Sequence, residues 1–235
     1  DFNMYVPTKI LFGAGTLNEL GKQQLPGKKA VIIISNGKST RANGYLSRTE
    51  EQLAQAGVAT SVFDKIQPNP LKETVIEGAA FVKAQGADFI VALGGGSVID
   101  SAKAIGYGLT NEGDVWDYYT GKAPQAWMPI GAVLTIAAAG SEMSNASIIT
   151  NENGWLKRGA YSPYAYCKFA VMNPELTYTL PAYQTASGCT DIIVHSLERF
   201  FTKPDVKQLN LTDGIAETLI KNVMRNVKTC LLYTS

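Results

Sequence analysis

The stretch ALGGGSVIDSAK, residues 92–103, decides the fold class of this chain of 235 residues. It follows directly from an apolar run, DFIVAL at 88–93, and continues into a segment with the apolar spacing of a helix. A short apolar run rich in β-branched residues indicates a strand that is buried on both faces. The stretch therefore predicts a strand, a tight turn of three glycines and a helix, in that order.

The same order recurs on both sides of this stretch. Apolar runs typical of strands also lie at 30–35, 58–64, 127–136 and 168–175. Helical patterns that end in glycine lie between the first strands, at 45–57 and 73–86. Strands and helices that alternate at this spacing form a parallel sheet with right-handed crossovers. We therefore expect an α/β domain built on a parallel sheet.

The pattern changes near residue 178, where two helical patterns begin and no strand pattern returns. In the second, Ile215, Leu219, Val223 and Val227 recur every fourth residue, which predicts an apolar stripe. The helical pattern stops near Lys228 without a capping glycine or proline. We expect an α/β domain over 1–178, the start of a helical domain over 179–229 and a non-native tail over 230–235. A frayed helix end is the alternative explanation of the last residues.

Composition excludes several classes of protein. Apolar residues make up 46% and charged residues 17%, and the net charge of +1 comes with no basic stripe, which argues against a nucleic-acid partner. The longest apolar runs are too short to span a bilayer, and the N-terminus does not resemble a signal peptide. The three cysteines form no CxxC pair, which favours reduced thiols in a cytosolic protein. We expect a cytoplasmic globular protein with neither a nucleic acid nor a membrane as its partner.

The glycine turn is a candidate site for a phosphate. Gly94, Gly95 and Gly96 lie between a buried strand and a helix, which is where open α/β sheets bind ligands. Glycines allow close approach of the backbone, and the helix N-terminus favours an anion. Ser97 and Asp100 fit an S-x-x-D capping pattern. The turn matches neither G-x-G-x-x-G nor a P-loop, so a purely structural tight turn stays the alternative.

The turn after the first of these strands bears on the choice of cofactor. Asn36, Gly37, Lys38 and Ser39 occupy it, and Arg41 follows. In sheets that bind a dinucleotide, an acid near this place bonds the adenosine ribose and disfavours a 2′-phosphate. This turn has no acid and two nearby cations, so NADP is favoured over NAD. A solvated polar loop is the alternative interpretation.

Asp191 and His195, in DIIVHSLERF at 191–200, are one helical turn apart, and His195 is the only histidine of the chain. A carboxylate and an imidazole on one helix face can bind the same divalent cation. Two protein ligands are too few for a stable catalytic site, however. A helical hydrogen bond or a surface pair is the simpler interpretation of the spacing alone.

Several segments together resemble the iron-containing (group III) alcohol dehydrogenase family, in its butanol dehydrogenase and broad-range aldehyde reductase branch. They are YVPTKILFGAGTLNELG at 5–21, PNP at 68–70, GGGSVIDSAKA at 94–104, VLTIAAAGSEMS at 133–144, MNPELTYTLP at 172–181 and ASGCTDIIVHSLERF at 186–200. Each segment alone is weak, whereas their combination in this order is specific.

The resemblance implies an N-terminal NAD(P)-binding domain, a helical metal-binding domain and a dehydroquinate synthase-like fold. It implies that Gly95, Gly96 and Ser97 hold the pyrophosphate, that Asn69 lines the cofactor cleft and that Lys157 approaches the ribose. Thr135 and the backbone of 138–141 would lie near the nicotinamide. The complete set of candidate cofactor-binding residues is Asn36, Gly37, Lys38, Ser39, Asn69, Gly94, Gly95, Gly96, Ser97, Asp100, Thr135, Ala138, Ala139, Ser141 and Lys157.

Two features depart from or qualify this pattern. Ala139 stands where the family usually has the threonine of T-G-S-E, which removes a hydroxyl from the cofactor cleft. Asn36 stands where members that prefer NAD carry Asp, in agreement with the expected preference for NADP.

Asp191 and His195 would be the first two ligands of an iron or zinc ion. The family's two further histidine ligands lie well downstream, so we expect a chain that is truncated at its C-terminus. In an intact member the metal acts as a Lewis acid on the alcohol oxygen while hydride passes between the substrate and the nicotinamide. No catalytic residue beyond the metal ligands is expected.

Three functional hypotheses stay open at this point. The first is a metal-dependent, NAD(P)-linked alcohol dehydrogenase or aldehyde reductase, with a small alcohol or aldehyde as its partner and a homodimeric parent protein. The second is a truncated, inactive nucleotide-binding fragment, which would bind NADPH weakly and hold metal poorly. The third is an enzyme of the dehydroquinate synthase or glycerol dehydrogenase type.

Overall fold

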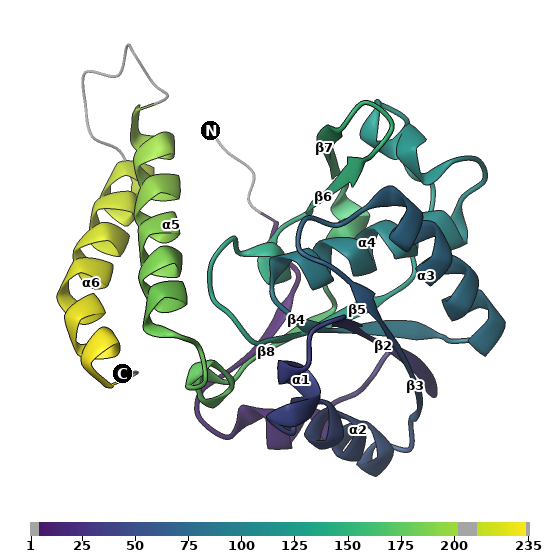
Figure 1. Cartoon of the computed structure of the whole chain (residues 1–235), viewed down its shortest axis with the longest axis horizontal. Coiled ribbons are helices and arrows are strands. Elements are labelled where there is room, and N and C mark those ends of the chain that lie inside the picture. Colours follow the sequence, from purple (N-terminus) through teal and green to yellow (C-terminus); the bar gives the residue numbers. More distant parts are fainter. Residues whose placement is uncertain (1–4, 202–210, 234–235) are drawn as a thin grey trace. The chain divides into compact units, whose positions relative to one another are not determined.

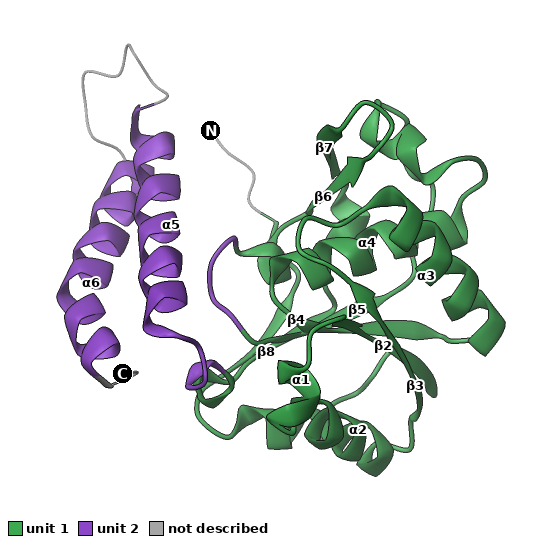
Figure 2. Ribbon diagram, viewed as in Figure 1, with its two compact units in different colours: residues 1–135, 140–176 green, residues 136–139, 177–235 purple. Residues whose placement is uncertain are grey.

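The computed structural model describes residues 5–201 and 211–233. It contains two compact units (Figure 2). Unit 1 comprises Asp1–Thr135 and Gly140–Leu176, and unit 2 comprises Ile136–Ala139 and Thr177–Ser235. Among the described residues, no helix is both long enough and apolar enough to cross a bilayer.

Unit 1 is built on a six-stranded sheet in which every neighbouring pair of strands is parallel (Figure 1). Its strands are β1 (Lys9–Phe12), β2 (Lys29–Ser35), β3 (Ala59–Ile66), β4 (Phe89–Gly94), β5 (Ile130–Leu134) and β8 (Phe169–Met172), in the order β1-β8-β5-β4-β2-β3. At the centre, Ala92 of β4 is aligned with Ile33 of β2 on one side and with Ala132 of β5 on the other. The predicted α/β domain with a parallel sheet is therefore confirmed.

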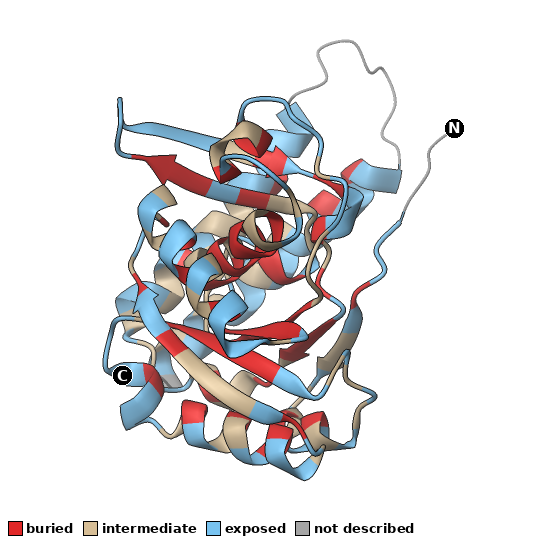
Figure 3. Ribbon diagram, turned by 90° about the vertical axis from the view of Figure 1, so that its right-hand side faces the viewer, coloured by how far each residue is buried: buried red, intermediate tan, exposed pale blue. Residues whose placement is uncertain are grey.

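Two apolar layers cover the sheet, one on each face. Successive residues of a strand point to opposite faces, so Val31 and Ile33 belong to one buried cluster and Ile32 and Ile34 to the other. The helices of unit 1 are α1 (Ser39–Ala42), α2 (Tyr45–Gln55), α3 (Lys72–Gln85) and α4 (Gly96–Thr110). Residues of α3 and α4 pack in the first cluster, and residues of α2 and of a 3₁₀ helix at Thr16–Lys22 pack in the second. Figure 3 shows the buried strands between these layers.

The centre of the sheet leaves little room between strands and neighbouring side chains. Gly131 of β5 is aligned with Phe169 of β8, and a Cβ atom at Gly131 would lie 2.0 Å from Cζ of that ring. Only glycine leaves space for the ring there.

The predicted strands at 127–136 and 168–175 are present as β5 and β8. Both are shorter than the apolar runs in the sequence.

Three strands of unit 1 were not predicted from the sequence. One is β1 at the edge of the sheet, and the other two are β6 (Ala146–Asn151) and β7 (Leu156–Tyr161), which form an antiparallel hairpin. The hairpin is attached to the segment after β3, because Leu71 forms a β-bridge with Thr150 and the Thr150 N–H donates to the Pro70 carbonyl at 2.7 Å. The signal available in the sequence was the turn ENG at 152–154, which directly follows the segment ASIITN at 146–151.

Unit 2 contains two helices that pack against each other, α5 (Ala182–Phe201) and α6 (Leu211–Tyr233) (Figure 2). The predicted end of the helical pattern near Lys228 is wrong, because α6 continues to Tyr233. No glycine or proline interrupts 229–233. The last two residues of the predicted tail, 234–235, lie outside the described residues.

The predicted apolar stripe on α6 is only partly correct. Val223 and Val227 are half-buried, whereas Ile215 and Leu219 are exposed. A step of four residues rotates by about 40° beyond a full helical turn, so a row at every fourth position winds around the helix. The four residues therefore do not share one face.

Candidate cofactor site at the carboxyl edge of the sheet

The strand order contains a reversal between β2 and β4. These strands are neighbours, although β3 lies between them in the sequence and pairs with the other edge of β2. The chain thus moves outward from β2 to β3 and then returns across β2 to β4. Open α/β sheets bind ligands beyond the carboxyl ends of the strands at such a reversal. The turns that follow β2 and β4, at 36–39 and 94–97, flank this place.

The glycine turn presents backbone to this edge. A Cβ atom at Gly94 would lie 2.6 Å from Cγ2 of Val98, so glycine is required there. Gly95 precedes α4, and its carbonyl accepts the N–H groups of Val98 and Ile99 at 3.0 and 3.1 Å. Gly96 and Ser97 come before these first helical donors. Their N–H groups and the helix dipole favour an anion at this turn.

The predicted S-x-x-D cap on this helix is wrong. Gly95 is the capping residue and no side chain caps α4, because the helix already begins at Gly96 and Ser97 lies inside its first turn. Oδ1 of Asp100 instead accepts a hydrogen bond from Oγ of Ser141 at 2.6 Å. The N-terminus of α4 is therefore left without a side-chain acceptor of its own.

A pocket of about 370 Å³ lies at the end of β2, the strand next to β4 in the sheet. Its lining residues are Ser35, Asn36, Gly37, Lys38, Arg41, Ala42 and Asp64. Arg41 forms an ion pair with Asp64 of β3 at 2.8 Å, and both side chains are about half exposed. Ser39, which was predicted to lie in a turn, begins the single-turn helix α1. The pocket thus has a cationic rim with one carboxylate.

Two predicted residues that are 88 positions apart in the chain meet at the hairpin. Nζ of Lys157, on β7, donates to Oδ1 of Asn69 at 3.0 Å. Asn69 follows β3 and has a positive φ of 56°, which asparagine tolerates better than most residues. The PNP loop and the hairpin are therefore joined by a side-chain bond as well as by backbone bonds.

The loop after β5 begins against the glycine turn. The Thr135 N–H donates to the Gly94 carbonyl at 3.1 Å, so the structure brings Thr135 next to the predicted phosphate site. The chain then enters unit 2 for four residues, and Ala138 and Ala139 belong to that unit. Within unit 2, a Cβ atom at Gly188 of α5 would lie 2.7 Å from the Ala137 carbonyl oxygen, so α5 needs glycine at this position.

Sequence reasoning missed Lys103, which lies on α4 one turn after Asp100. It is fully buried, and Nζ donates to the carbonyl oxygens of Ser141, Ser144 and Ala146 at 2.7, 2.9 and 2.8 Å. Its position in GGGSVIDSAK was visible, but its partners are about forty residues away in the sequence. The turn over 141–146 is therefore fastened to the same helix that begins at the glycine turn.

Lys103 and the ionisable groups around it are mostly buried. Burial lowers the pKa of Lys103, while Cys167, Asp100 and Glu142 oppose this shift. Burial also raises the pKa of Asp100, against the opposing effects of the Ser141 hydroxyl and of Lys103. The buried Cys167 thiol has its pKa raised to about 11 by burial. A buried ammonium is tolerated only with hydrogen bonds and opposite charge nearby, and this cluster supplies both.

The metal-ligand candidates lie on α5. Asp191 Oδ1 and His195 Nε2 are 3.7 Å apart, and both side chains are about half exposed. Imidazole together with carboxylate suits iron or zinc. Across residues 5–201 and 211–233, no group of three or more His, Cys, Asp or Glu side chains is arranged to hold a metal ion. The pair fits part of a metal site and is too small for a complete one.

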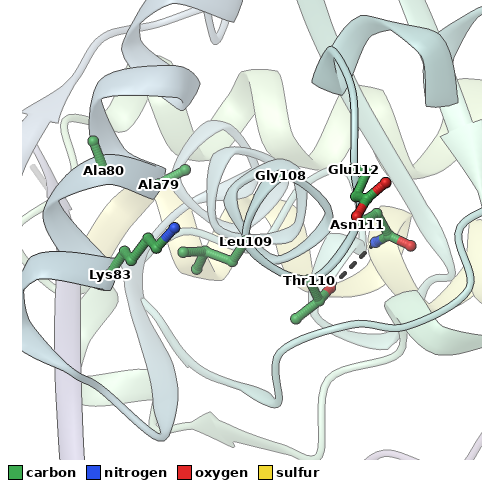
Figure 4. A pocket seen from close by; sticks show the side chains of 8 residues that line it. All are labelled: Ala79, Ala80, Lys83, Gly108, Leu109, Thr110, Asn111 and Glu112. Carbon is green, nitrogen blue, oxygen red and sulfur yellow. Dashed lines mark hydrogen bonds between the residues drawn. The ribbon is translucent and has the colours of Figure 1, made fainter.

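A second pocket lies at the other end of α4, where α4 packs beside α3. It has a volume of about 380 Å³ and is lined by Ala79, Ala80, Lys83, Gly108, Leu109, Thr110, Asn111 and Glu112 (Figure 4). A helix of this length places its two ends about 20 Å apart. This pocket is therefore separate from the glycine turn.

Comparison with known proteins places these features in context. A family model described as iron-containing alcohol dehydrogenase matches residues 7–174. The chain is 38% identical over 225 residues to a probable NADH-dependent butanol dehydrogenase 1 of Bacillus subtilis. It is 35% identical over 234 residues to the NADPH-dependent aldehyde reductase YqhD of Escherichia coli.

Solved structures of similar proteins include a butanol dehydrogenase. The crystal structure of an NADH-dependent butanol dehydrogenase A from Thermotoga maritima is similar with a TM-score of 0.90 and 34% identity. The match covers 97% of this chain and 57% of that one. The curated relatives are likewise covered over 58% and 60% of their length, with 95% and 97% of this chain aligned. The chain thus spans less than two thirds of the proteins it matches.

Proposed function

Because this chain belongs to the iron-containing alcohol dehydrogenase family, we propose that it supplies the nucleotide-binding part of a nicotinamide-dependent oxidoreductase that interconverts an alcohol and an aldehyde. The observation that carries this proposal is the uncapped glycine turn at the strand reversal, Gly94–Ser97. The names of the relatives, a butanol dehydrogenase and an aldehyde reductase, support this substrate class. They also favour oxidation and reduction over a lyase reaction of the dehydroquinate synthase type.

We propose that the dinucleotide lies along the carboxyl edge of the sheet. The N–H groups at Gly95–Ser97 bind its pyrophosphate, and Asn69 and Lys157 bind a ribose. Thr135 and Ser141 orient the nicotinamide and keep water from it. When bound, the nicotinamide exchanges a hydride with the carbon atom that bears the substrate oxygen. In this proposal, residues 1–178 form the NAD(P)-binding domain, and residues 179–229 form the start of the metal-binding domain.

We further propose that NADPH is preferred over NADH. The pocket at the end of β2 has Lys38 and Arg41 on its rim, and residues 36–39 contain no acid. A 2′-phosphate would compete with Asp64 for the Arg41 guanidinium, which binds phosphate well in a bidentate manner. The relatives include both NADH-dependent and NADPH-dependent enzymes. The proposed preference for NADPH therefore rests on the residues of this turn.

Asp191 and His195 are the proposed metal ligands of this chain, for iron or zinc. A metal bound there would act as a Lewis acid on the oxygen of the alcohol or aldehyde. The family resemblance assigns two more histidines to this metal, and His195 is the only histidine of the sequence. We therefore expect this chain alone to bind metal weakly.

For the whole protein we propose a homodimer in a reducing compartment such as the cytoplasm. Cys167 and Cys189 are in no disulfide and Cys167 is buried, which suits reduced thiols. Strand β1 lies at an edge of the sheet, and its last residue, Phe12, is 71% exposed. The edge of a sheet presents backbone groups that can pair with a second copy.

The nucleotide proposal is tested by placing a negative charge in the glycine turn. Ser97→Asp should weaken binding of NADPH by at least about tenfold, because a carboxylate there repels the pyrophosphate. Fluorescence titration of the chain with NADPH and with NADH measures this loss and the preference between the two cofactors.

Ser47→Asp is the matched control for this experiment. Ser47 is an exposed serine in the first turn of α2, so the same charge is added at another helix N-terminus. An acid in the first turn does not destabilise either helix. The proposal is wrong if the unaltered chain binds neither cofactor, or if Ser97→Asp binds NADPH as well as Ser47→Asp does.

A further inference from the structure

We propose that Lys103 is a positioning residue for the nicotinamide end of the bound dinucleotide, because its ammonium group holds the turn at 141–146 against α4. This inference rests on the nucleotide binding proposed above. It assigns a role to a buried side chain that touches neither the pyrophosphate turn nor the metal ligands.

The first step of the argument is the bonding of Lys103. Its three short hydrogen bonds go to the backbone carbonyls of Ser141, Ser144 and Ala146, and an ammonium group has three donors to match them. A second link runs beside it, since Oγ of Ser141 donates to Asp100. Residues 141–145 contain one short 3₁₀ helix, Ser141–Met143, and no strand, and these side-chain bonds fasten the turn to α4. Directly after the turn, Oγ of Ser147 also donates to the Asp100 carbonyl at 2.8 Å.

The second step is that one helix carries both contacts. The N-terminus of α4 presents Gly95–Ser97 to the pyrophosphate, and Lys103 lies two turns further along. The position of the turn at 141–146 is therefore set relative to the pyrophosphate site through a single rigid element. A shift of this turn would change the space available to any group that extends from the pyrophosphate toward β5.

The third step identifies that group as the nicotinamide half. The cationic pocket lies at the end of β2, the pyrophosphate turn at the end of β4, and the next strand in the sheet is β5. With the adenosine on the β2 side, the other half of the dinucleotide extends over the end of β5. The segment that follows β5 begins at Thr135, which is bonded to Gly94, and returns to unit 1 at Gly140. The turn held by Lys103 continues directly from there.

The experiment compares two ligands that differ only at the end in question. NADPH is one, and 2′-phospho-ADP-ribose, which lacks the nicotinamide, is the other. Lys103→Met removes the three donors while keeping most of the side-chain volume. We expect the affinity for NADPH, divided by the affinity for 2′-phospho-ADP-ribose, to fall by about tenfold. The reason is that one buried set of charge-assisted bonds is lost. The affinity for the truncated ligand itself should stay within about twofold, because the pyrophosphate turn keeps its own bonds.

Lys83→Met is the matched control, since Lys83 is an exposed lysine on α3 that lines the pocket at the far end of α4 (Figure 4). It should leave both affinities unchanged. Equal losses for both ligands in Lys103→Met would show a purely structural role and overturn the inference. An unchanged ratio would overturn it as well. Failure of the unaltered chain to bind either ligand would instead contradict the proposed function.

A measurement on the unaltered chain covers the case in which Lys103→Met does not fold. Amide hydrogen exchange at 141–146 should slow when NADPH is added and should not slow with 2′-phospho-ADP-ribose. The same protection with both ligands, or with neither, would place the turn away from the nicotinamide and overturn the inference.

Discussion

At the scale of single residues, one carboxylate can hold two strands of the sheet together. Asp88, directly before β4, is an example. Its Oδ2 accepts the N–H groups of Lys28 and Lys29 at 2.7 and 2.9 Å, so one carboxylate secures the start of the neighbouring strand β2. These bonds lower the pKa of Asp88 below its ordinary value of 3.8. The bonded form is therefore the charged form.

This shift gives a prediction for stability against pH. A carboxyl whose pKa is lower in the folded state stabilises the fold above its ordinary pKa of 3.8 and loses that contribution as the pH falls through the lowered value. Asp88→Asn should therefore lower the melting temperature at pH 7. The difference from the unaltered chain should shrink as the pH falls below 3.8. Thermal unfolding followed by circular dichroism at pH 7 and at a pH below 3.8 checks this. A difference in melting temperature that does not change with pH would contradict the prediction.

The residue scale also shows what sequence alone could and could not reveal about the site. The glycine turn was predictable because its signal is local, with three adjacent glycines between a strand and a helix. Lys103 was not, because its partners at 141–146 come from a different part of the chain and a lysine in a helix is usually exposed. The S-x-x-D pattern misled for the opposite reason: the local motif is present, but Asp100 is bonded to Ser141.

At the scale of elements, the central strands were predictable and the peripheral ones were not. Strands β2, β4 and β5 are buried on both faces, so each is a continuous apolar run. Strand β1 has no buried residue, and β7, with the sequence LKRGAY, is mostly exposed. Such strands are stabilised by pairing with neighbours rather than by their own apolar content, so their signal is weak. The hairpin that positions Lys157 was missed for this reason.

The contact between the hairpin and Asn69 gives a prediction for cofactor affinity. Lys157→Met should reduce NADPH affinity several-fold, by about 1 kcal/mol, since it removes a charged hydrogen-bond donor and frees Asn69. Arg158→Met is the control, because Arg158 is the next residue on the same exposed strand and adjacent residues of a strand point to opposite faces. Fluorescence titration measures both. Equal losses in the two variants would indicate a general effect of positive charge instead of the proposed contact with the ribose.

At the scale of the whole molecule, unit 1 has a continuous buried core on both faces of its sheet, whereas the helix pair of unit 2 is mostly exposed. On α6, Ile215 is 52% exposed, Leu219 46% and Met224 63%. Exposed apolar residues that gather on one element favour association between molecules. The fold class of unit 1 followed from its sequence pattern, but the division of apolar residues on α6 depends on how α6 packs on α5.

This surface predicts self-association of the chain. The double variant Ile215→Glu with Leu219→Glu should shift the population toward monomer, because it replaces exposed apolar surface with charge. Thr218→Glu serves as the control, since it adds charge on the exposed part of the same helix without removing apolar surface. Sedimentation velocity over a range of concentrations gives the measurement. A chain that is already monomeric at high concentration would contradict the prediction.

The path of the backbone between the two units has a mechanical consequence. The chain passes from unit 1 to unit 2 after Thr135, returns after Ala139 and leaves again after Leu176. Three covalent crossings mean that a rotation of unit 2 has to be absorbed by backbone torsions at three places at once. The first crossing follows immediately after the residue whose N–H is tied to the Gly94 carbonyl. A change in backbone torsion at this crossing would therefore reach the glycine turn through one residue, Thr135.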